Sequence, residues 1–190
     1  MYVKYFTEAL ILGNRERGES DRVFTLYTKD FGLVRARASA VRKESSRMRY
    51  ALQNYSYAQV ALVRGKRGWR VGGAIALRSA GDDRESVAAF ARIAHLIVRL
   101  IAGEEQNQYL FAAFAEAHVA LMQEKCEARA TIELVCVARV LYALGYLSAE
   151  ALETALFTHT AYTGEHLLEA ESKRDKLLVS INKAIAETHL

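Results

Sequence analysis

Short apolar runs separated by polar turns fill the first 80 residues of this 190-residue chain. The runs are rich in β-branched and aromatic residues, which favour strands, and they cover residues 8–13, 23–28, 33–41, 53–63 and 69–77. Gly72 and Gly73 lie inside the last run and predict a bulge or strong coiling there. Five short strands joined mostly by tight turns predict a small barrel of the OB type, closed or nearly closed.

From Asp82 onward the apolar positions recur at the period of a helix. Asp82 followed by Glu85 fits a capping box, and the first apolar stripe ends at Gly103. Further apolar stripes cover residues 110–122, 128–144, 149–157 and 177–185, with Asn107, Ser148 and Ser172 as candidate caps and residues 158–164 as a loop. We therefore expect an α+β protein, with an N-terminal five-stranded OB-fold barrel in residues 1–80 and a C-terminal helical bundle domain in residues 81–190.

Charge is divided unequally between these two parts. Residues 1–80 hold 16 Lys and Arg against 6 Asp and Glu, a balance of +10, whereas residues 81–190 hold 10 against 16, a balance of −6. A half-chain with so large a positive balance is typical of a protein that binds polyanions, and the other half repels them. The sequence therefore predicts that the barrel binds nucleic acid and that the helical domain serves packing and partner contacts.

The basic side chains of the barrel fall in two hairpin-like regions. In a strand over residues 33–41, Arg35 and Arg37 share the outward face, while Val34, Ala36 and Ala38 share the other face. The candidate DNA-binding residues of the two regions are Arg35, Arg37, Arg42, Lys43, Arg47, Arg49, Arg64, Lys66, Arg67, Trp69 and Arg70. Guanidinium groups bind phosphates and aromatic faces stack on bases, and three tyrosines and the tryptophan interleave these charges: Tyr50, Tyr55, Tyr57 and Trp69. The alternative is an ordinary basic surface whose tyrosines pack in the barrel core.

The pattern of histidines, cysteines and carboxylates indicates no catalytic or metal-binding site. His95 and His118 lie among apolar helical residues, and we expect them in the core or just beneath the surface. Cys126 and Cys136 are expected on different helical faces as reduced thiols, so we predict no metal, no cofactor and no enzymatic activity. The N-terminus has no signal-peptide pattern, and charges interrupt each apolar run before it reaches the length of a membrane span, so we expect a cytoplasmic protein.

Motifs in both parts of the chain resemble those of one known protein family. In the N-terminal part they are residues 8–12 (EALIL), 18–28 (GESDRVFTLYT), 31–33 (FGL) and 36–43 (ARASAVRK). In the helical part they are residues 133–146 (ELVCVARVLYALGY) and 181–190 (INKAIAETHL). The chain resembles the RecO family of bacterial recombination mediators over nearly its whole length, and the N-terminal motif is the most specific part of the resemblance.

This resemblance implies a DNA repair and recombination mediator of the RecF pathway, bacterial and nucleoid-associated. It implies binding of single- and double-stranded DNA, annealing of complementary strands, and help in loading RecA on DNA coated by single-stranded DNA-binding protein (SSB). The implied partners are RecR and the C-terminal tail of SSB, with no membrane. Many family members carry a four-cysteine zinc-binding segment after the Leu-Gly-Tyr helix, whereas residues 147–157 (LSAEALETALF) contain no cysteine, so we predict no zinc.

A partner site and two other functions complete the expectations. An acidic tail peptide that ends in an aromatic residue fits an apolar groove with cations beside it. The candidate partner-binding residues are Arg92, Arg99, Arg129 and Arg139. The first alternative function is an RNA-binding OB-fold module with a helical protein-interaction domain, which competition between RNA and DNA would distinguish. The second alternative is a hydrolase that uses His159 or His166.

Overall fold

The structure is a computed structural model that describes residues 3–43, 46–123 and 127–188. The chain divides into two compact units. The first unit comprises Met1–Ala80 and Ile101–Asn107, and the second comprises Gly81–Leu100 and Gln108–Leu190. Besides the break near residue 80 that the composition indicates, the structure therefore assigns a short later segment to the first unit.

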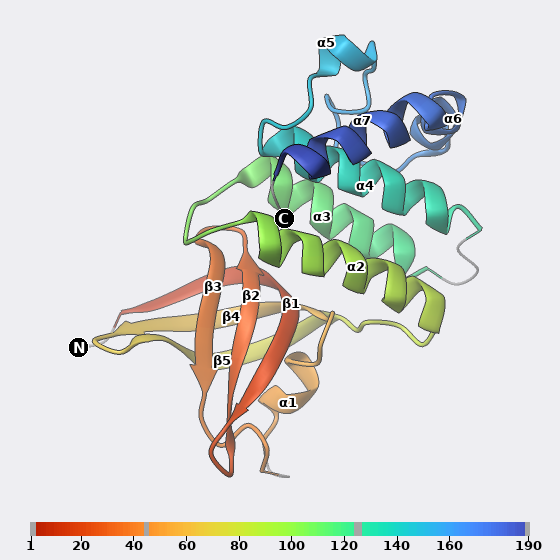
Figure 1. Cartoon of the computed structure of the whole chain (residues 1–190). Helices are drawn as coiled ribbons and strands as arrows, with labels where there is room; N and C mark the ends of the chain where they lie inside the picture. The colour runs from red at the N-terminus through yellow and green to blue at the C-terminus, as the bar shows by residue number, and fades with distance from the viewer. Residues whose placement is uncertain (1–2, 44–45, 124–126, 189–190) are drawn as a thin grey trace. The chain divides into compact units, whose positions relative to one another are not determined.

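The first unit contains a closed barrel of five strands, which confirms the expected OB-type architecture (Figure 1). The strands are β1 (Lys4–Arg17), β2 (Asp21–Thr28), β3 (Gly32–Ala38), β4 (Tyr57–Gly65) and β5 (Gly68–Arg78). They follow the order β1-β2-β3-β5-β4 around the barrel, and the pairing of β3 with β5 is parallel whereas the other pairings are antiparallel. In the closed barrel each strand pairs with a neighbour on both sides, so residues alternate between a packed interior and an outer face.

The alternation expected for the third strand is present in β3. Val34, Ala36 and Ala38 are buried in the barrel core, whereas Arg35 and Arg37 are exposed. Small residues suit the interior at this point because neighbouring strands contribute larger side chains to the same core. The bulge expected at the glycine pair is also present, because the pairing of β4 with β5 shifts register where Gly72 lies.

Two local features of the barrel unit differ from the expectation. The strand β1 extends to Arg17, four residues beyond the predicted run, as one arm of a hairpin with β2. The basic segment after β3 was expected to be a loop, but it contains the short helix α1 (Met48–Ala51). The sequence pattern did not predict the end of β1 or helix α1, because both segments are mostly polar and neither has a continuous periodic pattern of apolar residues.

The second unit is helical, as expected. Its helices are α2 (Arg84–Leu100), α3 (Gln108–Leu121), α4 (Arg129–Ala143), α5 (Ala149–Leu152), α6 (Gly164–Ser172) and α7 (Arg174–Glu187). Helix α4 contacts α2, α3, α6 and α7, which explains why most of its residues are buried. Phe90 of α2 stacks on Phe114 of α3 with ring centres 4.6 Å apart. Apolar stripes on these helices thus meet in a core of their own.

The ends of several helices correct the expectation. Asp83 caps α2 in place of Asp82, since its carboxylate accepts a hydrogen bond of 3.1 Å from the backbone N–H of Ser86. Ser148 caps α5 as expected, but the helix ends at Leu152 because Glu153 is left-handed, with φ 48°. The helix α6 was not anticipated. Its Ser172 was expected to cap α7, but Ser172 donates to the carbonyl of Glu169.

The histidines and cysteines are placed only partly as predicted. His95 is exposed, which corrects the expectation of a position at or beneath the core surface. His118 is fully buried and lies edge-on to the ring of Phe90, as expected for a core histidine. Cys136 is a buried free thiol whose pKa is raised to about 12 by burial. Cys126 lies outside the described residues.

Candidate nucleic-acid interface

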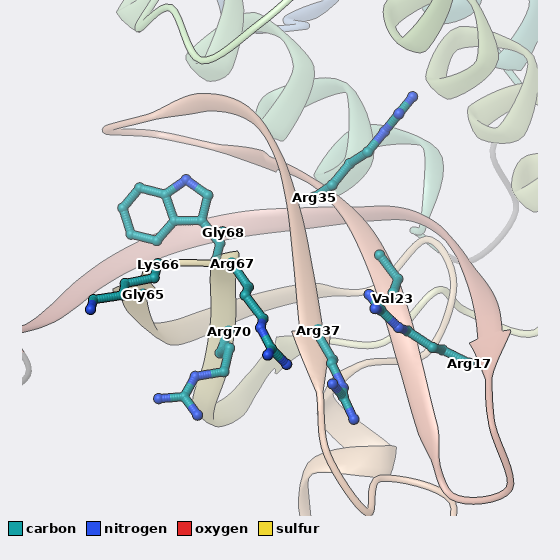
Figure 2. A pocket seen from close by; sticks show the side chains of 10 residues that line it. Arg17, Val23, Arg35, Arg37, Gly65, Lys66, Arg67, Gly68 and Arg70 are labelled. Atoms are coloured by element: carbon teal, nitrogen blue, oxygen red, sulfur yellow. The ribbon is translucent and has the colours of Figure 1, made fainter.

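The barrel carries a groove of about 370 Å³ on its outer surface. Its lining residues come from the end of β1, from β2, from the outward face of β3, from the turn between β4 and β5 and from the start of β5 (Figure 2). They are Arg17, Val23, Arg35, Arg37, Gly65, Lys66, Arg67, Gly68, Trp69 and Arg70. Six of the ten carry a positive charge, and none of these lining residues carries a negative charge.

The parallel pairing of β3 with β5 brings the two basic regions of the sequence together. Ala36 pairs with Trp69 and Arg37 pairs with Arg70, so the outward side chains of β3 lie beside the start of β5. Gly65 pairs with Gly68 across a turn of two residues, Lys66 and Arg67. Gly68 has φ 96°, a backbone conformation that residues with a side chain rarely adopt, so a glycine here lets the turn close tightly.

Asp21 fixes the position of Arg37 at the groove. The Nε of Arg37 donates to the Asp21 carboxylate at 2.8 Å, and a second guanidinium nitrogen binds the same oxygen. The other carboxylate oxygen accepts a hydrogen bond of 2.8 Å from the backbone N–H of Ala40. The bonds from Ala40 and Arg37 hold the pKa of Asp21 below its usual value. Asp21 therefore stays ionised and orients the arginine.

The other groove cations are less constrained by acidic neighbours. Among the described residues, no carboxylate forms an ion pair with Arg17, Arg35, Lys66 or Arg67. Their charges are therefore available to an anionic ligand, and several cations close together raise the local concentration of such a ligand. Figure 2 shows that Arg37, Arg67 and Arg70 come from the facing parts of β3, the β4–β5 turn and β5.

The structure brings together only part of the predicted DNA-binding set. Arg35, Arg37, Lys66, Arg67 and Arg70 line the groove. Arg42, Lys43, Arg47, Arg49 and Arg64 do not line it. The first group lies on β3 and on the β4–β5 hairpin, which are neighbours in the barrel. Most of the second group lies in the segment around α1.

Three residues of the second group have partners of their own. Arg42 forms an ion pair of 3.3 Å with Glu16. Arg64 forms one of 3.4 Å with Glu104, from the segment Ile101–Asn107. Arg49 donates to the Tyr50 hydroxyl at 2.8 Å and lies 4.8 Å from the centre of that ring. These contacts are exposed, and each contributes little to stability.

The position of Trp69 corrects the expectation that it presents a stacking face. Trp69 is 5% exposed, and its ring centre lies 5.7 Å from that of Tyr5 and 5.1 Å from that of Phe31. The guanidinium of Arg64 lies 5.1 Å from the same ring. The tryptophan is therefore part of the barrel core. Its apolar ring packs there because a strand that begins beside a basic turn still alternates inward and outward.

Arg17 is the groove cation that the sequence did not indicate. Residues 14–21 read as a polar turn, whereas in the structure β1 continues to Arg17, which pairs with Asp21 across the β1–β2 hairpin. Gly18, with φ 68°, follows directly and turns the chain. The available signal for a longer strand was the alternation of Arg15 and Arg17 before Gly18, but no apolar residue in this segment supported it.

The arginines predicted to bind a partner peptide are mostly engaged within the helical unit. Arg92 binds Glu133 through two hydrogen bonds of 2.6 and 2.7 Å. Arg129 forms ion pairs with Asp83 and Glu85 that are 2.6 and 2.5 Å long. Arg99 is exposed on α2. A groove of about 340 Å³ between α5 and α7 is lined by none of these arginines.

Arg139 cannot serve a peptide ligand, which corrects its predicted role. It is completely buried, and it donates to the backbone carbonyls of Leu156, Thr160 and Ala161 at 2.9, 2.7 and 3.0 Å. Its guanidinium also lies 4.6 Å from the ring centre of Tyr162. Arg139 thus organises the loop that leads to α6, because a planar cation with several donors satisfies several carbonyls at once.

The described residues offer no cluster of three or more histidine, cysteine or acidic side chains that is arranged to hold a metal ion. His159 and His166, the alternative catalytic residues, stack on each other with ring centres 5.4 Å apart. His166 Nδ1 lies 3.1 Å from the hydroxyl oxygen of Thr163 and 3.1 Å from the carbonyl oxygen of Ala161, so its polar contacts are local. None of the helices in the described part of the chain has the length and apolar character needed to cross a bilayer.

Comparison with known proteins identifies the barrel. Residues 1–70 match the family model described as "Recombination protein O N terminal". These matches support an assignment of the chain to the RecO family. The five-stranded barrel is the OB-fold domain of that family, and the helical unit follows it. The fold class expected from the sequence is thereby confirmed.

Relatives of the chain carry the same family name. It is 44% identical over 62 residues to the DNA repair protein RecO of Desulfitobacterium hafniense (strain DSM 10664 / DCB-2), a match that covers 33% of this chain and 23% of the relative. It is 31% identical over 110 residues to the DNA repair protein RecO of Pelotomaculum thermopropionicum, which covers 56% of this chain and 43% of the relative. The matched part thus spans less than half the length of each of these RecO relatives.

Proposed function

We propose that this chain is a non-enzymatic DNA repair and recombination mediator whose barrel groove binds the sugar-phosphate backbone of single- and double-stranded DNA. The observation that carries the proposal is the groove itself, with six cationic side chains and no carboxylate in its lining. It also occupies the part of an OB fold, the β2–β3 face and the turns β1–β2 and β4–β5, at which such folds bind oligonucleotides. The names of the RecO relatives support a role in DNA repair.

Annealing of complementary strands follows from the same electrostatics. Two strands repel each other through their phosphates, and a protein that neutralises some of those phosphates lowers the repulsion and releases counterions. The groove supplies the positive charge, and the helical unit, whose formal charge is negative, supplies surface for protein partners. Within the RecF pathway the chain would act with RecR and the C-terminal tail of SSB to help load RecA on coated DNA.

The test is DNA binding as a function of salt, measured by fluorescence anisotropy with labelled single-stranded and duplex DNA. If each of the six groove cations contacts one phosphate of a single strand, the plot of log K against log salt has a slope of about −4. The variant Arg35→Ala/Arg67→Ala removes two cations that have no carboxylate partner among the described residues, so it leaves no acidic group unpaired. We expect the slope to become less negative by about 1.4, and strand annealing to slow.

Arg84→Ala/Arg99→Ala is the matched control, because it removes two exposed arginines from α2 and changes the net charge equally. The control should bind and anneal like the unaltered protein. An equal loss in both variants would show that net charge acts without the groove, and an unchanged slope in the groove variant would refute the proposal. Preference for RNA over DNA of equal length would favour the RNA-binding alternative.

A further inference from the structure

The groove lacks the side chains that hold bases. Proteins that bind single strands in OB folds commonly combine a cationic groove with aromatic faces on which the bases stack. Among the described residues that line this groove, Trp69 is the aromatic one, and it is 5% exposed. Trp69 belongs to the barrel core and its ring packs beside the rings of Tyr5 and Phe31, so neither face is open to a base.

The exposed aromatic residue of the basic region does not replace it. Tyr50 is 61% exposed, but it belongs to α1 and does not line the groove. The Arg49 guanidinium already lies 4.8 Å from the centre of its ring and donates to its hydroxyl. Tyr55 and Tyr57 are half-buried and do not line the groove either. None of the three tyrosines that interleave the charges in the sequence therefore lines the groove.

The groove side chains also suit phosphate better than base edges. Apart from Val23, the tryptophan and two glycines, every lining residue is an arginine or a lysine, and no amide, hydroxyl or carboxylate is among them. Guanidinium groups match phosphate oxygens with paired N–H donors. One of them, on Arg37, is held in a fixed orientation by Asp21. Contacts of this kind position a nucleic-acid strand without reading its sequence.

We infer that the groove holds a nucleic-acid strand by its phosphates alone and leaves the bases facing away from the barrel, free to pair. This inference rests on the proposed function and specifies how the same site binds. A strand stacked on aromatic side chains must release each base before it pairs, whereas a strand held by its backbone presents its Watson–Crick edges at once. The arrangement suits a protein that brings two complementary strands together.

The experiment compares two labelled oligomers of equal length and charge, an oligothymidylate and an abasic phosphodiester that lacks every base. With the full chain, we expect dissociation constants within about threefold of each other and equal salt slopes, because the bases contribute little. Arg35→Ala/Arg67→Ala should weaken both oligomers by the same factor. Oligothymidylate binding more than about tenfold tighter than the abasic oligomer would overturn the inference and leave the proposed function standing.

Trp69 supplies a second readout, because it is the only tryptophan of the chain. A base stacked on its ring would quench its fluorescence, so the inference expects a small change that is equal for the two oligomers. Strong quenching by oligothymidylate alone would overturn it. If neither oligomer binds, the proposed function itself fails, and the inference fails with it.

Discussion

The substitution Arg139→Met tests whether a buried arginine holds together the loop before α6. The side chain is completely buried in α4, and its three hydrogen bonds to Leu156, Thr160 and Ala161 carbonyls measure 2.7–3.0 Å. Methionine fills much of the same volume with a flexible apolar chain, so the change removes the donors with little loss of packing.

The expected loss of stability follows from these three bonds. A hydrogen bond to a charged group contributes about 1.5–3 kcal/mol, which gives about 4.5–9 kcal/mol for three. The burial of the guanidinium opposes folding by several kcal/mol, and methionine removes that penalty. Thr160 and Ala161 are half-buried, so water can replace part of what their carbonyls lose. The net loss of unfolding free energy is therefore about 3 kcal/mol, a large share of the total for a protein of this size.

Urea denaturation followed by far-ultraviolet circular dichroism measures this loss, and hydrogen exchange with mass spectrometry locates it. Exchange should rise in residues 156–163 and stay unchanged in the barrel strands. Arg139→Lys keeps the charge but cannot reach three carbonyls with a planar fork, so its loss should be intermediate. Arg99→Met, on an exposed position of α2, is the control and should change little. A loss below about 1 kcal/mol, or unchanged exchange in the loop, would refute the reasoning.

Two further changes test the helix cap and a close approach in the barrel unit. The Asp83 carboxylate accepts hydrogen bonds from the Ser86 hydroxyl and backbone, and its pKa is lowered from 3.8 to about 2. Its contribution to stability is present above about pH 4 and is lost as the pH falls through about 2, so Asp83→Asn should remove that part of the acid dependence of the urea midpoint. Gly32 has φ 63°, and a Cβ added there would lie 2.7 Å from the carbonyl carbon of Glu105. Gly32→Ala should therefore lower the unfolding free energy by about 2 kcal/mol or more, whereas Gly13→Ala, with nothing within 4 Å, should change it little. Equal urea midpoints for the two alanine variants, or an unaltered acid dependence in Asp83→Asn, would contradict these expectations.

The strands and most groove arginines were predictable because their signals are local. Alternation placed Arg35 and Arg37 outside and Val34 inside, and the glycine-flanked turn placed Lys66 and Arg67 at a hairpin tip. The sequence did not predict that these two groups of basic residues lie side by side, because their proximity depends on a parallel pairing of β3 with β5, which are far apart in the sequence. Such a pairing is set by closure of the barrel and leaves no mark on either strand alone.

The errors in the site have physical reasons as well. A basic neighbourhood made Trp69 look exposed, but strand alternation and two aromatic neighbours bury it. Arg139 looked like a surface cation because a charged residue inside a helix usually faces solvent. Its burial depends on backbone carbonyls of residues 156–161, which no pattern around residue 139 reveals. Tertiary contacts therefore decide which arginines are open to ligands.

The segment Ile101–Asn107 makes the barrel unit discontinuous along the amino-acid sequence. It interrupts the helical sequence between α2 and α3, yet its Glu105 backbone closes over the β2–β3 turn at Gly32 and its Glu104 pairs with Arg64. A truncation after residue 80 would strip that cover from the turn, so an expressed fragment is not equivalent to the native domain. Insertions or domain fusions at residues 101–107 would likewise perturb the barrel, although the primary structure places them among helices.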